Sequence, residues 1–215
     1  MRKLIRYLYK IFSVGIMLTL SKYYTFVFRI ILYINDIKFG YGLKTYKAIP
    51  RICINKKAKI VSIGNNVIFN NFTDVSWYCK SSIYVAEEAC FTMEDNSGMN
   101  GALVYCANCI KIGKFVNIGG GTRIIDTDFH NLDWRSRRDP AQNLKSKTAP
   151  IIIEDDVFIG TNCIILKGVT IGARSIIAAG SVVTKDIPSD SIAGGNPCRI
   201  LRRKSDYDLI EKNHE

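Results

Sequence analysis

Residues 151–188 read IIIEDDVFIGTNCIILKGVTIGARSIIAAGSVVTKDIP and carry a β-branched aliphatic residue at every sixth position. The repeated positions are Ile153, Ile159, Ile165, Ile171, Ile177 and Val183. Gly160 and Gly172 follow two of them and keep the same phase. A fixed short period indicates a repeat architecture, in which each unit buries its apolar side against its neighbours.

The same spacing appears earlier in the chain, at Ile112, Ile118 and Ile124. Cys106 lies one repeat before Ile112, so we interpret it as a small inward-facing residue rather than a redox or zinc ligand, although a CxxC runs from Cys106 to Cys109. Weaker register occurs at Ile54 and Ile60, and again at Ile63, Phe69 and Val75.

A period of six predicts one short strand and one turn for each unit, with three units closing a triangular coil. The sequence therefore predicts an all-β solenoid over residues 37–202, with Ile and Val stacked along its axis. Glycine and asparagine at the corners permit tight bends. Residues 127–150 lack the period and are rich in charge, so we expect a loop excursion there. Residues 203–215 are expected to form a tail or short helix.

The overall composition limits the kinds of partner that the protein can have. The chain has 215 residues, enough for one domain with an appendage, and a formal net charge of +11. A basic balance indicates an anionic partner, such as nucleic acid, anionic lipid or a polyphosphate cofactor. Seven cysteines, an odd number, argue against a disulfide framework and for a reducing compartment.

Residues 1–36 differ from the rest and are predicted to be a helical segment. Residues 1–35 carry basic residues but no acidic one, and their apolar runs at 11–20 and 25–34 are each too short to span a bilayer. A signal peptide is disfavoured because no small-residue cleavage site follows. Two interpretations stay open: amphipathic helices on the cytoplasmic membrane face, or a cap packed on the solenoid.

The excursion contains one of only two histidines in the sequence. His130 lies between Asp128 and Asp133, whereas His214 lies in the polar tail. A neutral imidazole can remove a proton from a hydroxyl, and a neighbouring carboxylate can fix its tautomer. The competing interpretation is an ordinary surface histidine. One histidine in the body cannot supply the zinc ligands of a β-helical carbonic anhydrase, so no metal is expected.

The end of the repeat indicates a binding surface for an extended anion. Residues 178–181 are small, which leaves the surface of the coil flat and its backbone amides accessible. Lys185, Arg199, Arg202 and Arg203 follow and offer cations for phosphate groups. A flat surface with a cationic end fits coenzyme A.

Two motifs carry a resemblance to a known family. The first is Asp126-x-Asp128-x-His130, followed by Asp133 and Arg137; the second is GSVVTKDIP at 180–188, followed by GNPCR at 195–199. They resemble the hexapeptide-repeat acyltransferases, in particular the maltose/galactoside O-acetyltransferase branch and its capsule and lipopolysaccharide relatives. The resemblance implies a left-handed parallel β-helix, a homotrimer, and acetyl-CoA in grooves between subunits.

Family roles are carried onto matching positions only. The resemblance implies that His130 is the general base and that Asp126 and Asp128 orient it or the acceptor. It places donor contacts at Thr161, Ala179, Thr184, Lys185, Arg199 and Arg202, and acceptor contacts at Asn100, Asp133 and Arg137. Phe158 stands where the family often has tryptophan, and the family's acceptor residues upstream of Ile112 have no clear match. The long helical domain expected of serine acetyltransferases is missing, and the acceptor is left open.

The sequence therefore predicts an acetyl-CoA-dependent O-acetyltransferase acting on a sugar or lipid-linked saccharide in surface-polysaccharide synthesis. Its predicted location is the cytoplasm, with contact to the inner membrane face through residues 1–35. The alternatives are an N-acetyltransferase of an amino sugar or antibiotic, and a non-catalytic β-helix scaffold. Nucleic-acid binding is not expected, because the basic residues lack a recognised module.

Overall fold

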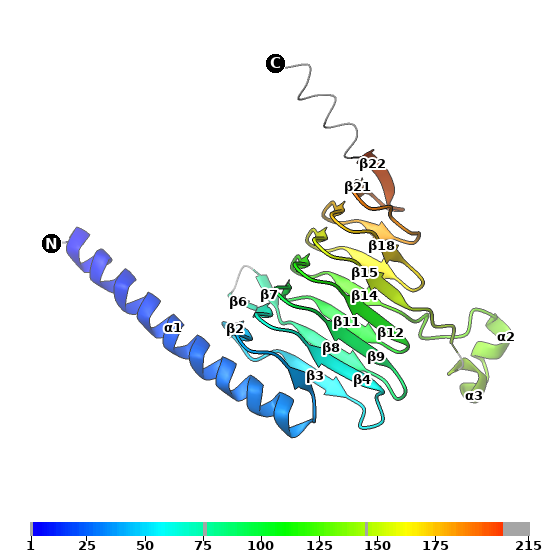
Figure 1. Cartoon of the computed structure of the whole chain (residues 1–215), viewed down its shortest axis with the longest axis horizontal. Coiled ribbons are helices and arrows are strands. Elements are labelled where there is room, and N and C mark those ends of the chain that lie inside the picture. Colours follow the sequence, from blue (N-terminus) through cyan, green and yellow to red (C-terminus); the bar gives the residue numbers. More distant parts are fainter. Residues whose placement is uncertain (1, 75–76, 145, 204–215) are drawn as a thin grey trace, which may run out of the picture.

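The computed structural model describes residues 2–74, 77–144 and 146–203. A long helix, α1 (Arg2–Ile34), leads into a stack of short strands that rises along one axis (Figure 1). The strands form three sheets, and the chain visits these sheets A, B and C in rotation. Each strand pairs in parallel with the strand one full turn further along, as β14 does with β17. The body is therefore a three-sided coil of parallel strands.

Each sheet takes one strand from each turn of the coil. Sheet A contains β1 (Lys38–Phe39), β4 (Ile60–Ile63), β9 (Cys90–Met93), β12 (Cys109–Ile112), β15 (Ile151–Ile153) and β18 (Thr170–Ile171). Sheet B contains β2 (Lys44–Tyr46), β5 (Ile68–Asn70), β10 (Gly98–Asn100), β13 (Asn117–Ile118), β16 (Phe158–Ile159), β19 (Ile176–Ile177), β21 (Ser191–Gly194) and β22 (Arg199–Arg203). Sheet C contains β3 (Arg51–Ile54), β8 (Ser82–Val85), β11 (Leu103–Cys106), β14 (Arg123–Ile125), β17 (Ile164–Leu166) and β20 (Val182–Val183).

Two elements interrupt the parallel pattern. The hairpin β6 (Phe72–Asp74) and β7 (Trp77–Cys79) is antiparallel and sits between β5 and β8 in the chain. At the far end, β21 and β22 pair antiparallel, so the last strand turns back along sheet B. The predicted carboxy-terminal helix falls on residues 204–215, outside the described residues, and Arg203 belongs to β22.

The core confirms the six-residue period. The repeat positions from Ile153 to Val183 are fully buried and point to the axis of the coil, and Cys106 is buried among them as predicted. Ile63 and Phe69 are buried as well. Stacking of β-branched residues from one turn onto the next gives the coil one continuous apolar core.

The weaker spacing in the sequence predicted that Ile60 points inward, and this prediction is wrong, because the side chain is 53% exposed. The turn over residues 55–59 is longer than the equivalent turn over 167–169, which shifts the inward phase to Ile63. Val75 lies outside the described residues.

The second half of α1 covers the first turn of the coil. Phe28 and Leu32 are fully buried, and the Phe28 ring meets the Phe69 ring edge-on at 5.3 Å between centroids. The Thr25 hydroxyl exchanges hydrogen bonds with the Thr45 backbone, at 3.0 and 3.3 Å. The predicted cap is therefore present in this half of the helix.

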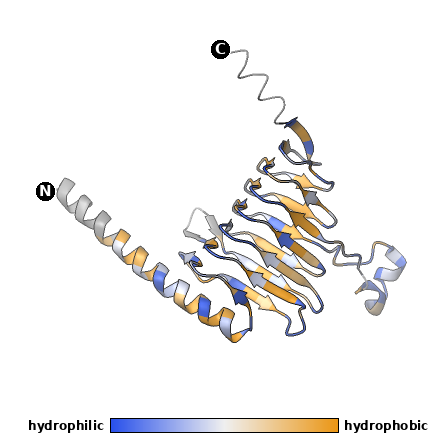
Figure 2. Cartoon of the chain, viewed as in Figure 1, coloured by the Kyte–Doolittle hydropathy of each residue, from blue (hydrophilic) through white to orange (hydrophobic). Residues whose placement is uncertain are grey.

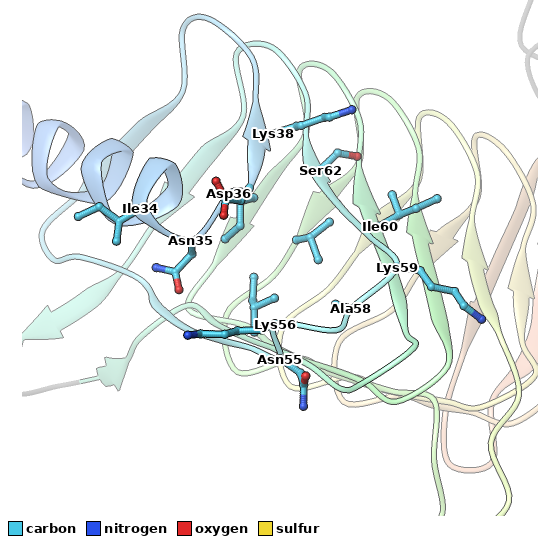
Figure 3. Close-up of a pocket in the computed structure, with 13 residues that line it drawn as sticks. Ile34, Asn35, Asp36, Lys38, Asn55, Lys56, Ala58, Lys59, Ile60 and Ser62 are labelled. Carbon is cyan, nitrogen blue, oxygen red and sulfur yellow. The ribbon is translucent and has the colours of Figure 1, made fainter.

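The cap leaves part of the first turn open. A pocket of about 610 Å³ lies beside the end of α1, with an apolar floor that includes Ile37 and Ile54. Lys38, Lys56 and Lys59 stand around its rim (Figure 3). The start of β1 and the end of β3 thus line an open recess rather than lying under the helix.

The loop excursion leaves sheet C after β14 and returns to sheet A at β15, as predicted. It carries two short helices, α2 (Trp134–Arg137) and α3 (Pro140–Asn143), which stand away from the coil (Figure 1). Hydrophobic residues concentrate on the strands, whereas the excursion is largely hydrophilic (Figure 2). The excursion therefore projects from the corner at which the chain passes from sheet C to sheet A, which we call the C–A corner.

Candidate active site

A short two-stranded stem fixes the base of the excursion. The Asp128 backbone N–H donates to the Lys147 carbonyl at 3.0 Å, and the Ala149 N–H donates to the Asp126 carbonyl at 3.1 Å. Thr127 and Thr148 form an antiparallel bridge between these contacts. The stem holds the next residues, beginning with Phe129, at a fixed height on the C–A corner.

Asp133 and Arg137 hold the excursion together from inside. The Asp133 carboxylate caps α2 by accepting from the backbone N–H groups of Arg135 and Ser136. Hydrogen bonds from Ser136, led by its side chain, lower the pKa of Asp133. The Arg137 guanidinium donates to the carbonyls of Asn131 and Leu132, at 3.0 and 2.7 Å. Both predicted acceptor contacts are thus occupied in shaping the loop.

The His130 ring is exposed and is held by Asn143 of α3. The Asn143 amide lies beside Nδ1 of His130, with Oδ1 at 3.2 Å and Nδ2 at 3.0 Å. The backbone N–H of Asn131 donates to the same Oδ1 at 3.3 Å, which supports a carbonyl oxygen facing this side of the loop. When this amide oxygen accepts a hydrogen bond from Nδ1–H of His130, the neutral imidazole has its free lone pair on Nε2. In the part of the chain that the structure describes, no protein group bonds to Nε2.

The two aspartates predicted to orient His130 make other contacts. The Asp126 carboxylate is fully buried and accepts from the backbone N–H groups of Ala107 and Asn108, at 2.6 and 2.8 Å. Burial raises the pKa of the Asp126 carboxyl, against the opposing effect of these two donors. Within residues 2–74, 77–144 and 146–203, neither Asp126 nor Asp128 bonds to the His130 ring.

Asp128 is half of an ion pair that sequence reasoning did not find. Its Oδ1 lies 2.7 Å from Nζ of Lys167, which occupies the C–A corner one turn further along. Its Oδ2 is buried and accepts no hydrogen bond from the described residues. Asp128 and Lys167 therefore tie the excursion to the next turn, two residues from His130.

Small residues line the corner between sheets B and C, which we call the B–C corner. A Cβ added at Gly119 would lie 2.5 Å from the carbonyl carbon of Gly160, and one added at Gly160 would lie 2.6 Å from the backbone nitrogen of Ala179. The turns can stack this closely only because these positions are glycine. Ala179 and Gly180 are exposed at the top of this column, and the Gly180 N–H donates to the Thr161 carbonyl at 2.8 Å.

The predicted donor contacts fall into three groups. Thr161 and Ala179 lie on the B–C corner, Thr184 and Lys185 follow β20 on the C–A corner, and Arg199 and Arg202 lie on β22. Thr184, Lys185, Arg199 and Arg202 are all exposed. Sheet C separates the first two groups, so one chain does not gather all six residues around one ligand.

Asn100 lies on β10 of sheet B, the face opposite the C–A corner. It lines a pocket of about 400 Å³ between α1 and sheet B, together with Asn70 and Asn117. Among the described residues, no protein group bonds to the side-chain amides of these three asparagines. A single chain therefore places Asn100 and His130 on opposite sides of the coil.

Comparisons with known proteins show what this chain is similar to. A model of the "Hexapeptide repeat of succinyl-transferase" matches residues 150–185. The "Putative acetyltransferase YJL218W" of Saccharomyces cerevisiae is 31% identical over 175 residues, which cover 80% of this chain and 83% of that protein. The "2,3,4,5-tetrahydropyridine-2,6-dicarboxylate N-acetyltransferase" of Staphylococcus aureus is 47% identical over 64 residues, 30% of this chain. That match spans only 27% of the length of the Staphylococcus protein.

A solved structure shares the fold. A variant of AntD, an N-acyltransferase of Bacillus cereus in complex with dTDP-4-amino-4,6-dideoxyglucose and coenzyme A, superposes with a TM-score of 0.60. Its sequence is 23% identical, and the match covers 82% of this chain and 88% of that one.

Proposed function

Because the chain belongs to the hexapeptide-repeat acetyltransferases, we propose that it transfers the acetyl group of acetyl-CoA to a sugar hydroxyl in surface-polysaccharide synthesis. The observation that carries this proposal is the His130 ring, exposed on the excursion with Nδ1 engaged by Asn143. An imidazole held in this way can act as a general base through Nε2. Relatives named as acetyltransferases support the reaction class.

The proposed reaction is a direct transfer. Nε2 of His130 takes the proton of the acceptor hydroxyl while the hydroxyl oxygen attacks the thioester carbonyl carbon. The new C–O bond forms, the C–S bond breaks, and the coenzyme A thiolate leaves with the proton from His130. Burial raises the pKa of the thiols of Cys106, Cys163 and Cys198, which disfavours these three as nucleophiles.

The donor is proposed to lie along the exposed backbone of the B–C corner, on a left-handed coil as in the family. Thr161 and Ala179 would contact its pantetheine arm, and Thr184, Lys185, Arg199 and Arg202 would meet its hydroxyl and phosphate groups. The exposed Ala179 and Gly180 support this placement, because no side chain there blocks an extended ligand. The binding of coenzyme A by AntD agrees with it.

We propose that the active site is completed in a homotrimer. One chain separates the B–C corner from the C–A corner by sheet C, and it separates His130 from Asn100 by the whole coil. A neighbouring copy would bring its excursion to the sheet of the first copy. The three unbonded amides of Asn70, Asn100 and Asn117 would then face an acceptor, and amides suit the hydroxyl groups of a saccharide.

We place the protein in the cytoplasm, at the inner face of the membrane. The odd number of cysteines supports a reducing compartment, because it argues against a disulfide framework. A lipid-linked saccharide acceptor would be presented at this face, where α1 would hold the enzyme.

An acceptor screen with acetyl-labelled acetyl-CoA tests the proposal. We expect label on a neutral nucleotide sugar or lipid-linked saccharide, and we expect mild alkali to release it, because an ester is cleaved and an amide is not. Alkali-stable label on an amino sugar would establish the N-acetyltransferase instead. Absence of acetyl-CoA binding by calorimetry would favour the non-catalytic scaffold.

Asn143 provides a second test, because its amide lies beside Nδ1 of His130 and would select the tautomer of the ring. Asn143→Ala is expected to lower kcat by about 10- to 100-fold, as is typical when a group that orients a histidine is lost. Asn143→Asp keeps an acceptor, stabilises the imidazolium, and should move the acid limb of the pH–rate profile to higher pH. The ¹⁵N shifts of His130 are readily assigned, because the sequence has only one other histidine. An unchanged kcat in Asn143→Ala, together with an unchanged pH profile in Asn143→Asp, would show that Asn143 does not position the base.

A further inference from the structure

One side of α1 carries a stripe that is apolar or aromatic at every position but one. Its positions recur at alternating intervals of four and three residues, which an α-helix places along one face. They are Phe12, Ile16, Thr19, Tyr23, Phe26, Ile30 and Tyr33, which we call the α1 stripe. The six apolar and aromatic members are between 41% and 78% exposed. The exception is Thr19, whose hydroxyl donates to the Gly15 carbonyl at 3.0 Å.

The α1 stripe points away from the coil. The opposite side of the helix holds the cap, in which Ser21, Phe28 and Leu32 are buried. The Arg29 guanidinium also donates to the Leu43 carbonyl at 2.9 Å. Figure 1 shows the amino-terminal half of α1 extending beyond the coil, and Figure 2 shows hydrophobic residues along its described part. The coil therefore fixes the rotation of α1 and presents the stripe outward.

The positive charge of residues 1–35 favours an anionic partner for the α1 stripe. Arg2, Lys3, Arg6 and Lys10 precede the stripe, and no acidic residue occurs before Asp36. Four exposed aromatic rings on the stripe are typical of the boundary between headgroups and acyl chains. Lys22, close to the stripe, can reach headgroups with its long side chain.

A second copy of α1 fits this surface poorly. A paired helix would need opposite charges beside the seam, and every charge on this helix is positive. An anionic lipid surface attracts this positive charge instead.

The helix is not arranged to cross the bilayer. Residues 14–34 form a segment that is long and apolar enough to span a bilayer, and 11% of its most apolar 18-residue stretch is buried in the protein. A span would require the capped side, with Phe28 and Leu32 packed on the coil, to enter the hydrocarbon together with the first turn. The cap thus argues against a span over residues 14–34 and favours an orientation parallel to the surface.

We propose that α1 lies in the plane of an anionic lipid bilayer, with the α1 stripe in the headgroup and acyl boundary and the coil on the opposite side. The proposal does not depend on acetyl transfer, since it rests on α1 and its cap alone. It goes beyond contact through residues 1–35, because it names the face that enters the lipid and excludes a span.

Flotation of the full chain with phosphatidylcholine vesicles, with and without phosphatidylglycerol, tests the proposal. We expect the wild type to float with the anionic vesicles and to be released by salt. The triple variant Phe12→Ser, Phe26→Ser and Ile30→Ser should bind at least about tenfold more weakly, because each change removes apolar area from the lipid face. Phe115→Ser with Leu144→Ser removes exposed apolar residues elsewhere and should float like the wild type.

The replaced side chains are exposed, so circular dichroism and thermal melting should be unchanged in both variants. A wild type that stays with the unbound fraction, or a triple variant that floats as well as the wild type, would overturn the proposal. Self-association that disappears in the triple variant, without flotation of the wild type, would assign the stripe to a second copy and would overturn it too.

Discussion

His130→Ala is expected to lower turnover by about 10³-fold while acetyl-CoA still binds with wild-type affinity. The ring contributes proton transfer in the transition state, and its side chain makes no contact that holds the coil together. Its side-chain contact within the described residues is to Asn143 on the same excursion. Removal of the ring should therefore lower kcat and kcat/KM together, which is the signature of an interaction made in the transition state.

The measurement is steady-state transfer of labelled acetyl, with donor affinity from calorimetry and subunit mass from analytical ultracentrifugation. His214→Ala is the matched control, because it removes the other histidine from the tail and should leave every parameter unchanged. Turnover within tenfold of the wild type in His130→Ala would rule out the general base. Loss of donor binding or of the assembly in the same variant would instead point to a structural role.

The sequence was sufficient to predict the coil, because its core repeats a single physical requirement. Each unit must place one apolar side chain on the axis, so Ile159 and Ile165 identify the inward face without any tertiary information. Prediction failed at Ile60, where the turn over residues 55–59 is longer and moves the inward phase to Ile63. A period survives only while every turn has the same length.

The orientation of His130 was harder to predict. A carboxylate near a histidine in sequence suggested Asp126 or Asp128, but Asp126 is buried under the backbone of Ala107 and Asn108. The group beside the ring is Asn143, 13 residues away across a loop without a period. Only the fold of the excursion, through the Asp139 cap of α3, brings this amide to Nδ1.

The two open interpretations of the amino-terminal segment are compatible in the structure. A hydrophobic pattern shows which residues avoid water, but not whether protein or lipid covers them. Phe28 and Leu32 pack on the coil, whereas Phe26 and Ile30 on the other side remain exposed. Sequence reasoning treated the cap and the membrane contact as exclusive because it did not assign the faces of the helix separately.

The second large effect is a loss of stability that we expect from a substitution at the B–C corner. Gly160→Ala is expected to destabilise the fold by about 3 kcal/mol, the upper end of typical overpacking costs. The added Cβ would lie 2.6 Å from the backbone nitrogen of Ala179, and a backbone atom cannot move aside as a flexible side chain can. The midpoint of thermal unfolding, at fixed protein concentration, should fall by on the order of 10 °C.

Gly15→Ala is the matched control, because nothing lies within 4 Å of a Cβ at that position. It adds the same methyl group to α1 and should be neutral or stabilising by up to about 1 kcal/mol. A melting midpoint for Gly160→Ala equal to that of the control would mean that the turns can separate at this corner. Since the proposed donor surface requires Thr161 and Ala179 to stay in register across Gly160, acetyl-CoA affinity should fall with stability in Gly160→Ala and remain unchanged in Gly15→Ala.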